Sequence, residues 1–80
     1  MNKIAAFIID TLTTKYGFAD DEVFPDSVFE DLGIDSLTIL ELLVMLEGRF
    51  CVSIPEGLLT EDMTIEGASS VVASLEEKVA

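Results

Sequence analysis

The apolar residues of this chain recur at helical spacing, and this periodicity is the feature that most limits how the chain can fold. A first helix is predicted over residues 2–16, where one face carries Ile4, Phe7, Ile8 and Leu12. A second is predicted over 36–50. A last helix is predicted from Ile65 to Val79, capped by Thr64, with one apolar face formed by Ile65, Ala68, Val72, Leu75 and Val79. Because the only β-like run, residues 51–54, has no partner strand, the sequence predicts an all-α protein.

Two connecting segments complete the predicted architecture. Residues 17–35 are punctuated by Gly, Pro and Asp, which resist a long helix, but apolar residues throughout predict an ordered loop with a short turn near Ser27–Asp31. Pro55 can begin a helix, and residues 56–62 are predicted to form one or two helical turns. We therefore expect a single domain over residues 1–80, an all-α small four-helix bundle with a long first loop and a short third helix.

The charge of the chain limits its partners. Four Lys and Arg stand against sixteen Asp and Glu, which gives a net charge of −12 with no histidine. Such a surface repels nucleic acid phosphates and anionic lipid, so neither nucleic acid nor membrane is expected as a partner. It favours proteins with basic patches. Without histidine, no Ser-His-Asp or Cys-His arrangement can form, and we expect neither catalytic residues nor an enzyme.

Cysteine usage and the start of the chain indicate a compartment. Cys51 is the single cysteine, so no internal disulfide can form, and we expect its thiol to be buried and inert. The apolar N-terminal stretch is short, is broken by Asp10 and has no small-residue cleavage site after it. No run approaches the ~20 residues that span a bilayer. We expect a cytoplasmic protein.

The predicted helix over 36–50 carries more apolar residues than one buried face requires. One face, for the core, consists of Ile39, Leu42, Leu43, Leu46 and Phe50. A second stripe, rotated well away from the first, consists of Leu37, Leu40 and Val44. Either the helix is covered on two sides, or the second stripe is exposed for a partner, and from the pattern alone the two are equally favoured. Neighbouring acids, among them Asp35, Glu41 and Glu47, favour an interaction face.

A motif stands at the start of this helix. Residues 31–37 read Asp-Leu-Gly-Ile-Asp-Ser-Leu, and Ser36 is a candidate helix cap with Asp35 beside the positive helix end. An isolated Asp-Ser-Leu says little by itself. With its surroundings, however, the segment resembles the attachment segment of acyl carrier proteins. The likeness covers nearly the whole chain and includes Glu41-Leu42, Leu46-Glu47, Phe50, Ile54-Pro55 and Thr64-Ile65.

The resemblance implies a prosthetic group. In this family a phosphopantetheinyl transferase attaches 4′-phosphopantetheine covalently to the residue that matches Ser36, and the arm then carries acyl or aminoacyl groups as thioesters. The residue that matches Asp35 helps to position magnesium during that transfer, and no metal site of the chain's own is implied. Leu37, Leu40 and Val44, with Glu41 and Glu47, would meet acyl-loading, condensing and tailoring enzymes through their basic docking patches. A monomer is expected, because these contacts must stay available to several enzymes in turn.

The sequence also departs from the pattern of carriers of primary fatty acid synthesis. Thr38 stands where an acidic residue usually follows the Ser-Leu pair, and Gly57, Leu58 and Leu59 replace much of the charge expected in the third helix. Gly48-Arg49 also interrupts the acidic end of the second helix. These departures favour a discrete carrier of a specialised polyketide or hybrid peptide–polyketide pathway over fatty acid biosynthesis.

Two other classes of protein fit parts of the sequence. A calcium-binding module is disfavoured because the acids at 20–22 and 26–31 lack the alternating ligand pattern with a central glycine. Weak divalent binding that relieves self-repulsion is nevertheless expected. An acidic helical interaction module without a prosthetic group, in which Ser36 merely caps its helix, is the main alternative.

Overall fold

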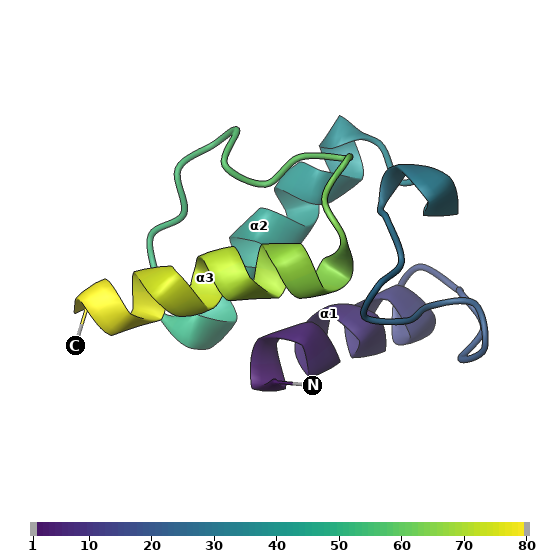
Figure 1. Ribbon diagram of the computed structural model, residues 1–80, viewed down its shortest axis with the longest axis horizontal. Helices are drawn as coiled ribbons and strands as arrows, with labels where there is room; N and C mark the ends of the chain where they lie inside the picture. Colours follow the sequence, from purple (N-terminus) through teal and green to yellow (C-terminus); the bar gives the residue numbers. More distant parts are fainter. Residues whose placement is uncertain (1, 80) are drawn as a thin grey trace.

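The computed structural model describes the backbone of residues 2–79 and the side chains of residues 2–76, and this part of the chain is all-helical. It contains three α-helices, α1 (Lys3–Thr14), α2 (Ser36–Phe50) and α3 (Ile65–Val79), and a short 3-10 helix, η1 (Glu30–Leu32). Figure 1 shows α3 in front of α2, with α1 packed against α3 and the segment between α2 and α3 arching over them. Within residues 2–79, no helix has both the length and the apolar character needed to cross a membrane.

Both ends of α1 follow from local sequence. The Asn2 side chain accepts the Ala5 N–H at 2.8 Å and caps the first turn. After Thr14 the chain turns through Gly17, whose φ of 80° is left-handed, and the Phe18 N–H donates to the Leu12 carbonyl at 3.1 Å. The predicted helix is therefore confirmed, with its end at Thr14 rather than at residue 16.

The long first loop is ordered, as predicted, because backbone hydrogen bonds and buried apolar side chains both hold it to the rest of the domain. Val28 forms an isolated antiparallel bridge with Thr64, and the Glu30 N–H donates to the Glu61 carbonyl at 2.8 Å. The expected short turn is present as η1. The loop contributes three buried side chains to the core, Val23, Phe29 and Ile34.

The predicted core faces of α2 and α3 are buried. In α2 these residues are Ile39, Leu42, Leu43 and Leu46, and in α3 they are Ile65, Ala68 and Val72. Phe50 is half-buried and packs its ring edge to face on Phe7, with the centroids 5.6 Å apart. Thr64 caps α3 as predicted, since its hydroxyl oxygen accepts the Gly67 N–H at 2.9 Å. Leu75 is half-buried, and the side chain of Val79 lies outside the described residues.

The short third helix predicted over 56–62 is not confirmed, so the bundle has three α-helices rather than four within the described residues. These residues form turns instead, one of which is closed by the Leu58 N–H donating to the Pro55 carbonyl at 3.1 Å. Gly57, the second residue of the predicted helix, has a φ of 90°. This left-handed conformation is incompatible with a right-handed helix. Leu59 is nevertheless buried, so an apolar contact holds the segment to the core.

The prediction of a buried Cys51 is wrong. Cys51 is exposed, and it ends α2 in a left-handed conformation with a φ of 55°. The chain leaves the helix axis at this residue, so the next side chains to reach the core belong to Val52 and Ile54. The hydrophobic neighbours of Cys51 in the sequence are therefore a poor guide to its own burial.

Candidate functional site

The motif at residues 31–37 forms the junction between η1 and α2. Gly33 ends η1 in the left-handed conformation, with a φ of 77° that only glycine adopts at little cost. Ile34 follows and is buried, so its side chain anchors the junction in the core. The next two residues, Asp35 and Ser36, are consequently held at the surface, where α2 begins.

Asp35, and not Ser36, is the cap of α2. Its backbone is extended, and its Oδ1 accepts the Thr38 N–H at 3.0 Å. This hydrogen bond lowers the pKa of the Asp35 carboxyl below its usual value, because it stabilises the charged form. The prediction of Ser36 as the cap is therefore wrong, and residue type could not have decided it, since aspartate and serine cap helices about equally well. Ser36 is the first residue of the helix, and it is exposed.

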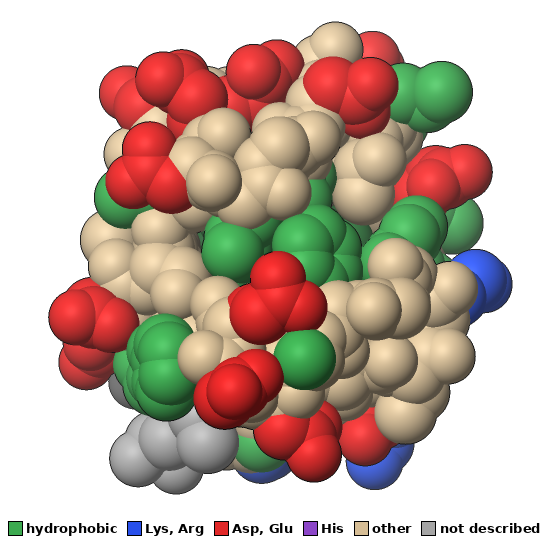
Figure 2. All heavy atoms as spheres, turned by 90° about the vertical axis from the view of Figure 1, so that its right-hand side faces the viewer, with side chains coloured by type: hydrophobic (Ala, Val, Ile, Leu, Met, Phe, Trp, Pro, Cys, Tyr) green, Lys and Arg blue, Asp and Glu red, His purple; other side chains and the backbone are tan. Residues whose placement is uncertain are grey.

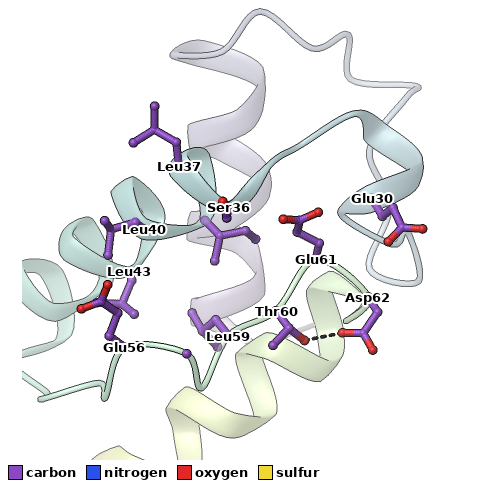
Figure 3. A pocket seen from close by; sticks show the side chains of 12 residues that line it. Glu30, Ser36, Leu37, Leu40, Leu43, Glu56, Leu59, Thr60, Glu61 and Asp62 are labelled. Carbon is purple, nitrogen blue, oxygen red and sulfur yellow. Dashed lines mark hydrogen bonds between the residues drawn. The ribbon is translucent and has the colours of Figure 1, made fainter.

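An apolar groove of about 600 Å³ lies between α2 and the segment 56–62, and Ser36 is one of its lining residues. Figure 3 shows Ser36 beside this groove, with Leu40 and Leu43 on the α2 side and Leu59 on the opposite side. Ile39, Leu43 and Leu59 are buried, so they form a floor continuous with the core. The groove is therefore an open apolar surface that includes Ser36 among its lining residues.

The rim of the groove is acidic. Glu30, Glu56, Glu61 and Asp62 line its edges, and the Thr60 hydroxyl donates to the Asp62 carboxylate. Figure 2, which views the molecule from the side of η1 and the first loop, shows acidic side chains around a central group of hydrophobic ones. Within the described residues, no group of three or more His, Cys, Asp or Glu is arranged to hold a metal ion. The site thus joins an apolar interior to an anionic surface.

The second apolar stripe of α2 is exposed. Leu37 has 65% of its surface accessible, Val44 59% and Leu40 38%. These values exclude one of the two alternatives left open by the pattern, because a helix covered on both sides would bury all three side chains. We call Leu37, Leu40 and Val44 the exposed stripe. It begins one residue after Ser36 and follows α2 for two turns.

The two glutamates predicted to flank the exposed stripe differ in their surroundings. Glu41 is exposed, and its Oε1 accepts the Tyr16 hydroxyl at 2.8 Å. Glu47 is half-buried, and its Oε2 accepts the Ile54 N–H at 2.8 Å. Glu47 therefore fixes the start of the segment after α2, and it presents less of its carboxylate to solvent than Glu41 does.

Sequence reasoning missed two contributors to this site. Tyr16 lies just after α1 and gave no signal of its own, because its contact with Glu41 spans 25 residues. Leu59 was noted only as a departure from the expected charge of a third helix, and the structure places it in the groove opposite α2. A lone aromatic residue after a helix and a leucine in a turn are too common in proteins to be assigned to a functional site from one sequence.

A family model described as "Phosphopantetheine attachment site" matches residues 6–72. This match includes the junction, all of α2, the groove-lining segment and half of α3. The chain belongs to this family. Its members hold a covalent 4′-phosphopantetheine arm and are carriers rather than catalysts, so the predicted cofactor is confirmed.

Curated relatives of this phosphopantetheine-binding chain are acyl carrier proteins. One from Chlorobium phaeobacteroides is 42% identical over 50 residues, which are 61% of this chain and 64% of that protein. One from Chloroherpeton thalassium is 33% identical over 57 residues, 70% of this chain and 71% of the relative. "Acyl carrier protein 2, chloroplastic" of Hordeum vulgare is 35% identical over 69 residues, 85% of this chain and 54% of the relative. The chain thus spans about 64% of the Chlorobium relative. No solved structure gives a significant match.

Proposed function

We propose that this chain is an acyl carrier protein whose phosphopantetheine arm is attached to Ser36. The observation that carries the proposal is the position of Ser36, an exposed hydroxyl at the first residue of α2 and at the mouth of an apolar groove. Family membership supports it, because the match spans this junction. The cargo would be an acyl or aminoacyl group, held as a thioester at the end of the arm.

The local electrostatics favour this attachment. The phosphodiester formed on Ser36 would lie at the positive end of the α2 dipole, which stabilises negative charge. Asp35 caps the helix through Oδ1, and its exposed carboxylate carries a second oxygen, Oδ2. We propose that this oxygen helps to position magnesium while the transferase loads the arm.

The groove supports a second part of the proposal. We propose that it receives the acyl chain of the cargo, since its floor is apolar and Ser36, where the arm would be attached, is among its lining residues. A reactive thioester would be sheltered there between visits to partner enzymes. The arm would raise the local concentration of cargo at each partner's active site, and the carrier itself would make or break no bond of the cargo.

Partner enzymes would meet the exposed stripe. Its apolar side chains would contribute contact area, and Glu41 would pair with basic residues around a partner's entrance. Glu47 would contribute less than predicted, because it is half-buried whereas Glu41 is exposed. The proposed partners are a phosphopantetheinyl transferase and acyl-loading, condensing and tailoring enzymes.

The pathway is proposed from the residues that depart from the pattern of housekeeping carriers. Thr38 and the segment from Gly57 to Leu59 favour a specialised polyketide or hybrid peptide–polyketide pathway over primary fatty acid synthesis. A monomeric single-domain carrier over residues 1–80 and a cytoplasmic location stay predictions.

The decisive experiment is the intact mass of the chain after incubation with coenzyme A, magnesium and a broad-specificity phosphopantetheinyl transferase. Wild type and the control Ser53→Ala, which removes an exposed hydroxyl elsewhere, should each gain one phosphopantetheine, and Ser36→Ala should gain none. Ser36→Ala should stay folded, because Asp35 caps α2. No gain on wild type, with the transferase active on another carrier, would favour an acidic interaction module without a prosthetic group.

A further inference from the structure

The two residues that follow α1 lie beside the exposed stripe. Tyr16 and Lys15 lie against α2, and with Leu40, Glu41, Val44 and Met45 they line a shallow hollow of about 330 Å³. Two members of the exposed stripe, Leu40 and Val44, therefore form one wall of this hollow. A partner that covers the stripe also covers the residues that follow α1.

Tyr16 joins the core to the surface of this hollow. Its ring is half-buried and packs against the hydrophobic core, whereas its hydroxyl donates to Glu41 Oε1 at 2.8 Å. A glutamate on a helix surface ordinarily samples several rotamers, and ordering it on binding has an entropic cost. The tyrosine restrains the carboxylate before any partner arrives. A carboxylate accepts about four hydrogen bonds, so Glu41 Oε2 and one further acceptor position remain for a partner.

We propose that Tyr16 is a positioning residue, which holds the Glu41 carboxylate beside Leu40 and Val44 for a cationic side chain of a partner enzyme. The partner surface that fits would present an apolar side chain to the hollow and a lysine or arginine to Glu41. This inference rests on the proposed carrier function, because it assigns a role to the same docking face. The hydrogen bond preorganises the docking face, since it holds the Glu41 carboxylate where the incoming cation would bind.

The contact itself has a spectroscopic signature. The chain contains one tyrosine and no tryptophan, so the ultraviolet absorbance of the phenolate reports on Tyr16 alone. Partial desolvation of the Tyr16 side chain and the bond to Glu41 together raise the pKa of Tyr16 above its ordinary value of 10.0. In Glu41→Gln the pKa of Tyr16 should fall toward that value. An unchanged pKa would overturn the contact on which the proposal depends.

The functional test is a double-mutant cycle on the loading reaction, with the transferase and the unloaded chain as its substrate. Tyr16→Phe keeps the ring in the core and removes only the hydroxyl. It should raise KM by about threefold to tenfold and leave kcat unchanged. In the Glu41→Gln background, Tyr16→Phe should have no further effect, because the carboxylate that it positions is gone. Thr14→Val is the control, since the Thr14 hydroxyl donates within its own helix, to the Asp10 carbonyl at 2.7 Å.

The outcomes separate this proposal from the function on which it rests. If wild type is not modified at all, the carrier function fails and the positioning role fails with it. If wild type is modified but Tyr16→Phe leaves KM unchanged, only the positioning role is overturned. An equal effect of Tyr16→Phe in the wild-type and Glu41→Gln backgrounds overturns it as well, because the tyrosine would then act independently of the glutamate.

Discussion

Asp35 and Ser36 could each cap α2 through a side-chain oxygen. Asp35 takes the cap position of α2, and the exposed Ser36 hydroxyl is left available for modification. Sequence alone located the start of α2 to the residue but assigned the cap to the wrong side chain, because the choice depends on which backbone is extended. The contact of Tyr16 with Glu41 could not be predicted from the sequence at all, since only the three-dimensional structure brings the two residues together.

The cap makes stability depend on pH in a defined direction. The pKa of Asp35 in the folded protein lies below its ordinary value of 3.8, so the charged carboxylate stabilises the fold above that value. This contribution is lost as the pH falls through the lower, folded-state pKa. Asparagine caps a helix without carrying a charge. Asp35→Asn should therefore lose less stability than wild type between neutral pH and about pH 3. Urea midpoints of both proteins at the two pH values check this, and equal losses would contradict it.

At the scale of elements, periodicity predicted the three α-helices and the core faces of α2 and α3, because 3.6-residue spacing reports directly on burial. It also separated a second apolar stripe on α2, which is exposed. The short helix predicted at residues 56–62, with Pro55 as its possible start, was not confirmed, because the segment forms turns that include Gly57 in a left-handed conformation. Local propensity could not show that the segment is held by Leu59 and by the backbone contacts of residues 61 and 63 with the first loop.

Two glycines near opposite ends of α2 should respond to alanine in opposite ways. Gly33 has a φ of 77°, so Gly33→Ala should destabilise the protein by about 1–2 kcal/mol even though the added Cβ would meet no atom within 4 Å. Gly48 lies inside α2 and is also open, so Gly48→Ala should stabilise by about 0.5–1 kcal/mol. Thermal or urea unfolding of both variants measures the difference, and each variant serves as the control for the other. Destabilisation by Gly48→Ala would show that its position on α2 is not free.

For the molecule as a whole, charge is distributed unevenly. Acids surround the groove near the start of α2, whereas Lys3 and Arg49 lie over the Phe50 ring at its end, each 5.6 Å from the ring centroid. Lys3 also pairs with Glu76 at 3.3 Å. The net charge of −12 predicted basic partners from composition alone, but only the structure reveals this polarity. A polarised carrier would approach a basic entrance with its Ser36 end first.

Self-repulsion among sixteen acids should make the fold sensitive to divalent cations. Millimolar magnesium or calcium should raise the Tm beyond the effect of sodium chloride at matched ionic strength. If neutralisation recovers about 1 kcal/mol, the Tm of a chain of this size rises by about 4–8 °C. Thermal unfolding followed by circular dichroism makes the measurement. Identical curves in magnesium and in the sodium chloride control would show that screening alone acts.

The left-handed residue that ends α2 also offers an experimental handle. Cys51 is the only cysteine, it is exposed, and it lies at the opposite end of the helix from Ser36, roughly 22 Å away at 1.5 Å per residue. A maleimide dye attached there before the arm is loaded would stay clear of both the groove and the exposed stripe. A second dye carried on the arm would then report, by energy transfer, whether the cargo lies along α2 or extends into solvent.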